Sequence, residues 1–415
     1  MSEPPGRRPR LTRRGFLVGT AAAGAGLVVG VSLGRPGFHR YVAGRIAHTL
    51  ESGMEAPADD AMAWFEIAPD DRVHFNVTKV EMGQGVHTAL TQIAADELEA
   101  RWEQMQVRRA DTRFGPGASA TYGSFSIAAS FLPLRRAAAA MRELLLGEAA
   151  RQLGLPREAL EAHQGTVRAQ RDHSRRLTFG EIVAGVTAWP DPPEDPPLKS
   201  RADFRYIGRS LPRIDFRDKL LGKPVYAYDV RKPGMLYGAV ARPPRIDAAM
   251  LAASAGDAAG MPGVEAIAID LEAGFAGVAA RTREQARTAV RALRVEWSSG
   301  RRPNQDDIES LLVADRDACT SVWRRGDGDR ALGDEPFTAE YFTPFAVHAQ
   351  LEPQAALVDP VAGEAFVSTQ MLEGCQAEIA RVLGRETAEV TVHNCYLGGS
   401  FGRKNGMDSG GEAAR

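Results

Sequence analysis

The chain has 415 residues, of which 44% are hydrophobic and 25% are charged. This length and composition predict a folded protein with a substantial core and two or three domains, and they exclude a disordered chain. The 51 basic and 53 acidic side chains nearly cancel, so the net charge gives no reason to expect a nucleic acid or an anionic membrane surface as a partner.

The first 35 residues have the layout of an export signal. A group of arginines precedes the uncharged stretch Phe16–Leu33, which is rich in Ala, Gly and Val. Within it, Thr12–Leu17 resembles the twin-arginine motif of signals that export folded proteins. We therefore expect a periplasmic protein that meets the membrane only through residues 1–35. An N-terminal transmembrane anchor is the alternative, since about 18 apolar residues can just span a bilayer. Residues 36–60 are expected to be a linker.

The first chemical motif is a loop between a strand and a helix. Residues 73–77 alternate apolar and polar side chains as a half-buried strand does, and residues 88–99 have the helical period. The first turn of a helix offers unpaired N–H groups, and glycine permits close approach to them. Glu81–Thr88, the first glycine loop, is therefore a candidate anion site; a simple glycine turn with a solvated Gln84 is the alternative. Its candidate binding residues are Gly83, Gln84, Gly85, Val86 and His87.

A second turn, residues 122–126, precedes an Ala-rich helix expected from about Pro133 to Leu153. Its candidate binding residues are Gly123, Ser124 and Ser126. Arg135 and Arg136 then fall in the first turn of the helix, where the helix dipole disfavours cations. This position favours a nearby anion or carboxylate, and two solvated arginines are the alternative.

The middle of the chain predicts strands but no catalytic cluster. Residues 191–200 are proline-rich and predict an extended connector at a domain boundary. Residues 219–230 and 233–240 are expected to be turn-punctuated strands, another strand begins at Val264, and 283–294 is expected to be a helix. Residues 301–335 are charged and predict a surface connection.

The last part of the chain repeats the strand–helix–strand–loop order. Residues 365–370 and 390–395 are expected strands, and 376–383 is an expected helix. The final strand runs into Leu397–Lys404, the second glycine loop. The candidate binding residues here are Gln370, Gly398, Gly399, Ser400, Phe401 and Gly402. Taken alone, Gln370 is more typical of a strand-end side chain in water.

The cysteines and histidines predict no metal ligation by the protein. Cys319, Cys375 and Cys395 are widely spaced and form no CxxC, so they lack the clusters that zinc or iron–sulfur sites need. Buried thiols are expected, and a Cys375–Cys395 disulfide is the alternative. The histidines His87, His348 and His393 lack ligand spacing.

The two glycine loops together resemble the molybdopterin-binding loops of the molybdenum hydroxylases. The resemblance is closest to the large subunit of the isoquinoline 1-oxidoreductase type, a xanthine dehydrogenase relative, and covers residues 64–404. It implies a mixed α/β (α+β) multidomain fold of xanthine dehydrogenase type. The implied parts are a molybdopterin-binding region at 61–212, an α/β hammerhead domain at 213–300, a connector at 301–335 and a second molybdopterin-binding region beginning at 336–404.

The resemblance also implies the cofactor and the reaction. Molybdenum–molybdopterin would lie on the loops, Gln370 would donate a hydrogen bond to an oxo ligand of the metal, and residues 399–402 would lie against the molybdenum–dithiolene group. The nucleotide form stays open, with the cytosine dinucleotide as one candidate. The implied reaction hydroxylates an N-heteroaromatic ring beside its nitrogen, or an aldehyde, with oxygen from water. Electrons would leave through a small [2Fe–2S] partner subunit, and a cytochrome c is one candidate acceptor.

The family's catalytic glutamate lies beyond the second glycine loop, so the resemblance assigns no catalytic base here. Residues 405–415 are expected to be a polar tail that departs from the family directly after Lys404, and Glu412 has no motif around it. Two alternatives remain open. One is a non-catalytic exported fragment or assembly subunit that keeps the fold, and the other is an unrelated exported binding protein that uses the glycine loops as turns.

Overall fold

The computed structural model divides into two compact units, residues 1–230 with 350–415 and residues 231–349. It describes residues 64–113, 120–184, 186, 188–245, 247–312, 326–332, 337, 339 and 341–415. The predicted export signal, the predicted linker and Cys319 lie outside the described residues.

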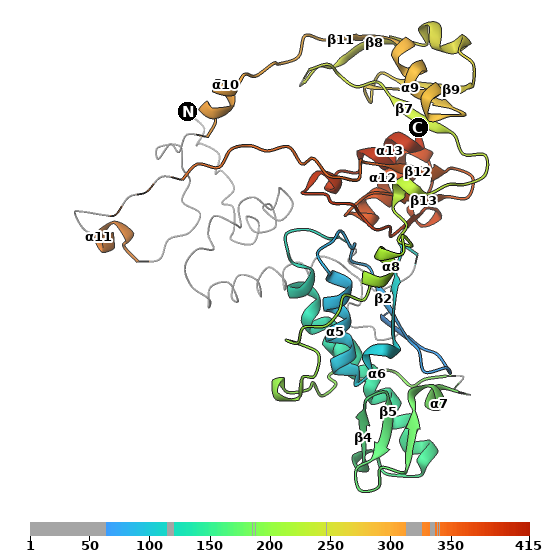
Figure 1. Ribbon diagram of the computed structural model, residues 1–415, viewed down its shortest axis with the longest axis vertical. Helices are drawn as coiled ribbons and strands as arrows, with labels where there is room; N and C mark the ends of the chain where they lie inside the picture. Colours follow the sequence, from blue (N-terminus) through green and yellow to red (C-terminus); the bar gives the residue numbers. More distant parts are fainter. Residues whose placement is uncertain are drawn as a thin grey trace, which may run out of the picture. The chain divides into compact units, whose positions relative to one another are not determined.

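The first half of the first unit is a three-stranded sheet with two long helices (Figure 1). Its strand order is β1-β2-β3, and β2 pairs antiparallel with β1 and parallel with β3. Helix α5 makes the crossover that a parallel pair needs, and α6 packs against α5. The elements are β1 (Phe65–Ile67), β2 (Val73–Val77), α5 (Val86–Leu98), β3 (Met105–Arg109) and α6 (Ser126–Leu153).

The sequence patterns explain these elements. Val73, Phe75 and Val77 are fully buried, so the predicted strand is confirmed with its apolar face in the core. The predicted helix after the first glycine loop is confirmed as α5. Residues 137–140, all alanine, are buried in α6, and such small side chains allow α6 to approach α5 closely.

The predicted start of α6 at Pro133 was wrong. The helix begins at Ser126 and carries Pro133 in its interior, where the proline removes one intrahelical hydrogen bond without ending the helix. Arg135 therefore does not lie in the first turn. Its Nε donates to Glu97 Oε2 at 2.8 Å, and Glu97 is fully buried, so this arginine neutralises a buried carboxylate and indicates no ligand.

Smaller elements complete this half. An antiparallel meander, β4-β5-β6, packs with α7 beside α6. The connector predicted at 191–200 is confirmed as an extended segment, because it contains neither helix nor strand, although both of its flanks belong to the first compact unit. The bounds are β4 (Leu160–His163), β5 (Thr166–Ala169), β6 (Arg176–Thr178), α7 (Phe179–Val183) and α8 (Phe216–Leu220).

The second half of the first unit repeats the arrangement of the first sheet. Its strand order is β12-β13-β14, with β13 antiparallel to β12 and parallel to β14, and α12 is the crossover. The predicted strand, helix and strand of this region are therefore confirmed in type. The elements are β12 (Ala356–Asp359), β13 (Glu364–Val367), α12 (Leu372–Leu383), β14 (Thr391–His393) and α13 (Asp408–Ala414).

The expectation of a tail without a core pattern at residues 405–415 was wrong. Helix α13 packs against α12 and β12, and Gly410 and Gly411 are buried. A Cβ on Gly410 would lie 2.5 Å from Cys375 Sγ. The glycines that suggested a loose ending instead permit close packing between the helices.

The second unit contains two small sheets, β7-β10-β9 and β11-β8. The strand predicted at Val264 and the helix predicted at 283–294 are confirmed as β9 and α9. The predicted connector contains two short helices, α10 and α11. The bounds are β7 (Tyr237–Val240), β8 (Met250–Ser254), β9 (Val264–Asp270), β10 (Phe275–Ala280), α9 (Arg283–Ala292), β11 (Arg294–Trp297), α10 (Gln305–Ser310) and α11 (Gly328–Leu332).

Residues 213–230 differ from prediction. They group with the first unit, so the compact second unit starts after the predicted hammerhead boundary, and the hammerhead assignment stays a prediction. The strands predicted at 219–230 were wrong: this segment contains the end of α8, a 3₁₀ turn and one isolated bridge from Tyr226 to Tyr396.

The 3₁₀ turns of the described residues are Trp102–Gln104, Arg157–Ala159, Arg201–Asp203, Ala227–Asp229, Gly256–Gly260, Thr387–Glu389 and Arg403–Asn405.

Of the helices in the described part of the chain, not one combines the length and the apolar composition that a bilayer crossing requires.

Candidate functional site

The predicted binding residues gather where the parallel strands of the two sheets end. In each sheet, one loop joins the central strand to the crossover helix, and another follows the third strand. Carboxyl ends of parallel strands are the usual ligand-binding edge of such sheets. The Leu397 N–H donates to the Glu81 carbonyl at 3.0 Å, so the two glycine loops lie together although the sequence separates them widely.

The first glycine loop satisfies part of its own N–H groups, and those of Gln84, Val86 and Thr88 meet no acceptor among the described residues. Glu81 is 1% exposed, and its Oε1 accepts from the N–H of Gly83 at 2.9 Å and of Gly85 at 3.0 Å. Its Oε2 accepts from the His87 N–H at 3.3 Å. The prediction of unpaired N–H groups at the start of α5 was therefore wrong for these three, because the chain supplies its own carboxylate there.

Gln84 closes the same loop from the outside. Its Oε1 accepts from the Met82 N–H at 2.7 Å, and its Nε2 donates to the Val80 carbonyl at 2.9 Å. Gln84 and Gly83 are nevertheless exposed. A Cβ added to Gly83 would meet no atom within 4 Å. A direct contact of Gln84 with a ligand stays a prediction, and it would use the second N–H of the amide.

His87 is buried under the first glycine loop. Its Nε2 donates to the Lys79 carbonyl at 3.0 Å, and its ring centroid is 6.0 Å from that of Tyr396. Burial lowers the pKa of His87, so the neutral ring is favoured. Val86 is also buried, as the first residue of α5. These contacts give both residues a packing role in the described structure.

The second glycine loop leaves a row of N–H groups open. The N–H groups of Gly399, Ser400, Phe401 and Gly402 meet no acceptor among the described residues. Positive φ angles of 91°, 55° and 103° at Gly399, Phe401 and Gly402 shape the loop. Phe401 is 73% exposed, and this conformation is costly for a residue with a side chain.

A buried ion pair supports this loop from below. Lys404 is fully buried, and its Nζ donates to Glu352 Oε2 at 2.6 Å. The same carboxylate oxygen accepts from the Gly398 N–H at 2.8 Å. A Cβ on Gly398 would lie 2.5 Å from Glu352 Cβ, so glycine at this position permits packing against Glu352 and is not needed for ligand approach.

Gln370 connects the second glycine loop to the turn before α6. It is 5% exposed, so the interpretation as a strand-end side chain in water was wrong. Its Oε1 accepts from Ser400 Oγ, and its Nε2 donates to the Thr121 carbonyl. One N–H of the amide has no acceptor among the described residues, and that N–H is the group a ligand would use.

The start of α6 is a second group of open N–H groups. Phe125 is the N-cap and gives no side-chain cap, and the N–H groups of residues 126–128 meet no acceptor in the described ranges. Gly123 and Ser124 have positive φ angles of 62° and 59°. Because Thr121 bonds to Gln370, the structure brings the predicted residues Gly123, Ser124 and Ser126 to the same region as the second glycine loop.

Sequence reasoning missed Lys79. This lysine is 8% exposed, and its Nζ donates to the Ala120 carbonyl at 2.9 Å. Burial lowers the pKa of Lys79 to about 8, against an opposing effect of Glu373. The lysine thus places a cationic group under the turn before α6, and no local sequence signal distinguishes it from a surface lysine.

The remaining candidates do not form a metal site. Cys375 and Cys395 are buried free thiols, as predicted, and burial raises the pKa values of these thiols to about 12 and about 11. His393 stacks on Phe366 with centroids 4.2 Å apart, and His348 is exposed in the other unit. Within the described ranges, no group of three or more His, Cys, Asp or Glu side chains could hold a metal ion.

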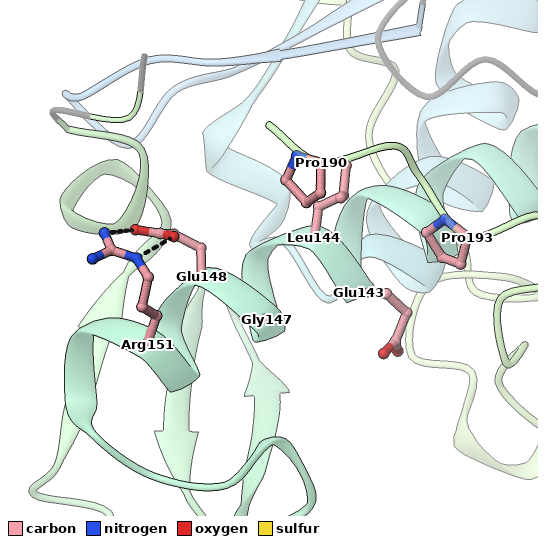
Figure 2. Close-up of a pocket in the computed structure, with 7 residues that line it drawn as sticks. All are labelled: Glu143, Leu144, Gly147, Glu148, Arg151, Pro190 and Pro193. Atoms are coloured by element: carbon pink, nitrogen blue, oxygen red, sulfur yellow. Dashed lines mark hydrogen bonds and ion pairs between the residues drawn. The ribbon is translucent and has the colours of Figure 1, made fainter. Parts of the chain in front are cut away.

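A hollow of about 540 Å³ lies along α6, away from the predicted residues (Figure 2). It is lined by Glu143, Leu144, Gly147, Glu148, Arg151, Pro190 and Pro193. Figure 2 shows Glu148 paired with Arg151, and Glu143 pairs with Arg157. Its charged groups therefore all have ion-pair partners within the fold, and it adds nothing to the candidate site.

The donor set fits the molybdopterin that the resemblance implies. Ser400 is 1% exposed, and its N–H meets no acceptor in the described chain; buried N–H groups are rarely left in this state. Together with the N–H groups at the start of α6, this row suits an anionic group with several acceptor atoms. The fit rests on the second glycine loop, Gln370 and residues 121–128 rather than on the N–H groups that Glu81 occupies.

Comparison with known families agrees with this fit. Two family models, both described as molybdopterin cofactor-binding domain, match residues 23–229 and residues 313–414. The second match includes α13, so the expectation that the family pattern ends at Lys404 was wrong.

Curated relatives are similar over most of the chain. A nicotinate dehydrogenase subunit of Pseudomonas putida is 33% identical and covers 81% of this chain. The beta subunit of isoquinoline 1-oxidoreductase from Brevundimonas diminuta is 30% identical over 95% of the chain. The membrane-bound aldehyde dehydrogenase [pyrroloquinoline-quinone] of Gluconacetobacter polyoxogenes is 31% identical over 96%. The chain spans 29%, 56% and 53% of the lengths of these relatives. It belongs to the molybdenum hydroxylase family.

Proposed function

We propose that this chain forms the cofactor-binding region of the large subunit of an exported molybdenum hydroxylase. The row of open N–H groups at residues 399–402, joined through Gln370 to the turn before α6, carries the proposal. These donors would hold the pterin and its anionic groups, and Gln370 would direct its free amide N–H toward the metal centre. Lys79 would add positive charge beneath the site.

The substrate class follows from the relatives. Two are named for nicotinate and isoquinoline, which are N-heteroaromatic, and the third is named an aldehyde dehydrogenase. Molybdopterin, when bound, supplies a metal centre that can hydroxylate such substrates with oxygen from water and accept their electrons. The exposed Phe401 ring would lie at the mouth of the site.

The partners and location complete the proposal. The three widely spaced cysteines lack the grouping that an iron–sulfur cluster needs, so electrons would pass to a small [2Fe–2S] subunit, with a cytochrome c as a candidate acceptor beyond it. The arginine-rich N-terminus supports export by the twin-arginine route to the periplasm. Neither Glu81 nor Glu352 is assigned as a catalytic base, because both carboxylates accept hydrogen bonds within the fold.

Molybdenum content tests the proposal. The chain would be co-expressed with cofactor maturation factors and a small iron–sulfur subunit, and the purified protein measured by elemental mass spectrometry. We expect a nearly stoichiometric metal content, which Gln370→Ala should lower by about tenfold or more, because residues next to a metal centre have effects of this size. Gln84→Ala should lower it less, since its amide already closes a loop.

Two results would contradict the proposal. If the wild-type chain contained no molybdenum, the assignment of the cofactor would be wrong. If both glutamine variants kept the wild-type metal content, the assignment of Gln84 and Gln370 to the site would be wrong. Bound molybdenum without turnover of N-heteroaromatic or aldehyde probes would instead support the alternative of an assembly subunit.

A further inference from the structure

Glu81 occupies the place where an external anion would bind at the start of α5. Its side chain is fully buried, and its carboxylate accepts from the N–H groups of Gly83, Gly85 and His87. Gly83 and Gly85 have φ angles of 108° and 80°, and the N–H groups of alternate residues 83, 85 and 87 converge on the carboxylate. Such a concave group of N–H donors is a typical anion-binding arrangement, and here the anion belongs to the chain itself.

A second layer of charge holds this carboxylate in place. Arg213 Nη2 donates to Glu81 Oε1 at 3.1 Å, and Arg213 Nη1 donates to the Gly83 carbonyl at 2.7 Å. Asp215 fixes the guanidinium by two bonds of 3.0 Å, and it also pairs with Lys219 at 2.5 Å. The segment 213–219 therefore clamps the loop from outside.

The backbone of Glu81 extends this order to the second glycine loop. Its carbonyl accepts from the Leu397 N–H, directly before the open row at 399–402. The carboxylate orders one loop, and the carbonyl of the same residue fixes the start of the other.

We propose that Glu81 is a built-in anion that positions both glycine loops for the cofactor. This role deepens the proposed function and rests on it only for the identity of the cofactor. It makes Glu81 a positioning residue, because it acts through the loop backbone.

Hydrogen exchange of the full-length chain without cofactor tests the role. In Glu81→Ala, the amides of residues 83–87 and of Leu397 should exchange about tenfold faster or more, since hydrogen bonds to a charged acceptor are lost. Sodium formate, which supplies a free carboxylate, should restore slow exchange, whereas sodium chloride at the same ionic strength should not. The proposal would be overturned if these amides exchanged in the folded Glu81→Ala variant as slowly as in the wild type. It would also be overturned if formate and chloride had equal effects on their exchange.

Glu97→Ala is the matched control, because it removes another fully buried carboxylate from the opposite end of the same helix. This control should lower overall stability. The ratio of amide exchange rates at residues 83–87 and 397 to those in β2 should stay as in the wild type. Loop exchange that rises equally in both variants would show general loosening and contradict the proposal.

Glu81→Gln covers the case in which the alanine variant does not fold. Its amide oxygen still accepts from Gly83 and Gly85, but its NH₂ group replaces the oxygen that faces His87. Exchange should rise selectively at His87, and a uniform profile across the loop would overturn the proposal. Molybdenum content is measured separately and tests the proposed function. Amide exchange tests the role of Glu81 even in a chain that binds no metal, so the two failures can be told apart.

Discussion

The two glycine loops look alike in sequence, and each follows a parallel strand, yet only in the first does a buried carboxylate of the chain accept from the loop N–H groups. In the first glycine loop, Glu81 and Gln84 accept from the loop N–H groups. In the second, the Ser400 hydroxyl donates to the Gln370 side chain, and the N–H groups at 399–402 meet no acceptor among the described residues. A side chain that accepts from a glycine-rich loop therefore reduces the number of N–H groups that the loop offers to a ligand.

The largest expected effect concerns the ion pair under the second glycine loop. Lys404→Met leaves the Glu352 carboxylate buried without its cation, so the free energy of unfolding should fall by about 3–5 kcal/mol. Urea-induced unfolding measures this change. The double variant Lys404→Met, Glu352→Gln should recover much of the loss because no charge is then buried alone. A stable single variant would mean that the loop does not depend on this pair.

A matched pair of glycine substitutions separates the loops by function. Gly83→Ala and Gly399→Ala both place a Cβ at a positive φ angle, so each should cost about 1–3 kcal/mol of stability. The added methyl group meets nothing within 4 Å at Gly83 and lies 3.3 Å from the Phe401 ring at Gly399. Only Gly399→Ala should strongly reduce molybdenum content at equal thermal stability. Equal metal loss in both variants would remove the distinction between the loops.

The smallest effect is a dependence of stability on pH that belongs to the first glycine loop. Burial alone would raise the pKa of Asp215, but hydrogen bonds from Arg213 and Lys219 lower it from 3.8 to about 2. Because the folded pKa is the lower one, this stabilisation is present above pH 3.8 and is lost as pH falls toward about 2.

Asp215→Asn should remove this component. Thermal unfolding measured at several pH values across that window should show a shallower decline in the variant than in the wild type. Parallel curves would indicate that Asp215 contributes nothing to acid sensitivity, and that the clamp on Glu81 is not electrostatic.

Local patterns in the sequence were sufficient for the regular elements and for the location of the loops. The alternation in β2 and the helical period in α5 reflect which side chains face the core, a property that each short segment carries by itself. The glycines at 83, 85, 399 and 402 likewise mark positive φ angles, which glycine adopts at little steric cost. The family resemblance added the cofactor, and comparison confirmed the family.

Contacts between distant segments decided the rest. The partner of Arg135 is Glu97, so the position of Arg135 in the helix does not indicate a ligand. The glycines of α13 permit close packing against Cys375 and Glu378. Glu81, Lys404 and Gln370 are ordinary polar residues in the sequence, and only burial beside particular donors and acceptors gives them their roles. The physical reason is that hydrogen-bond satisfaction depends on which groups folding brings together, and the spacing of residues along the chain does not determine it.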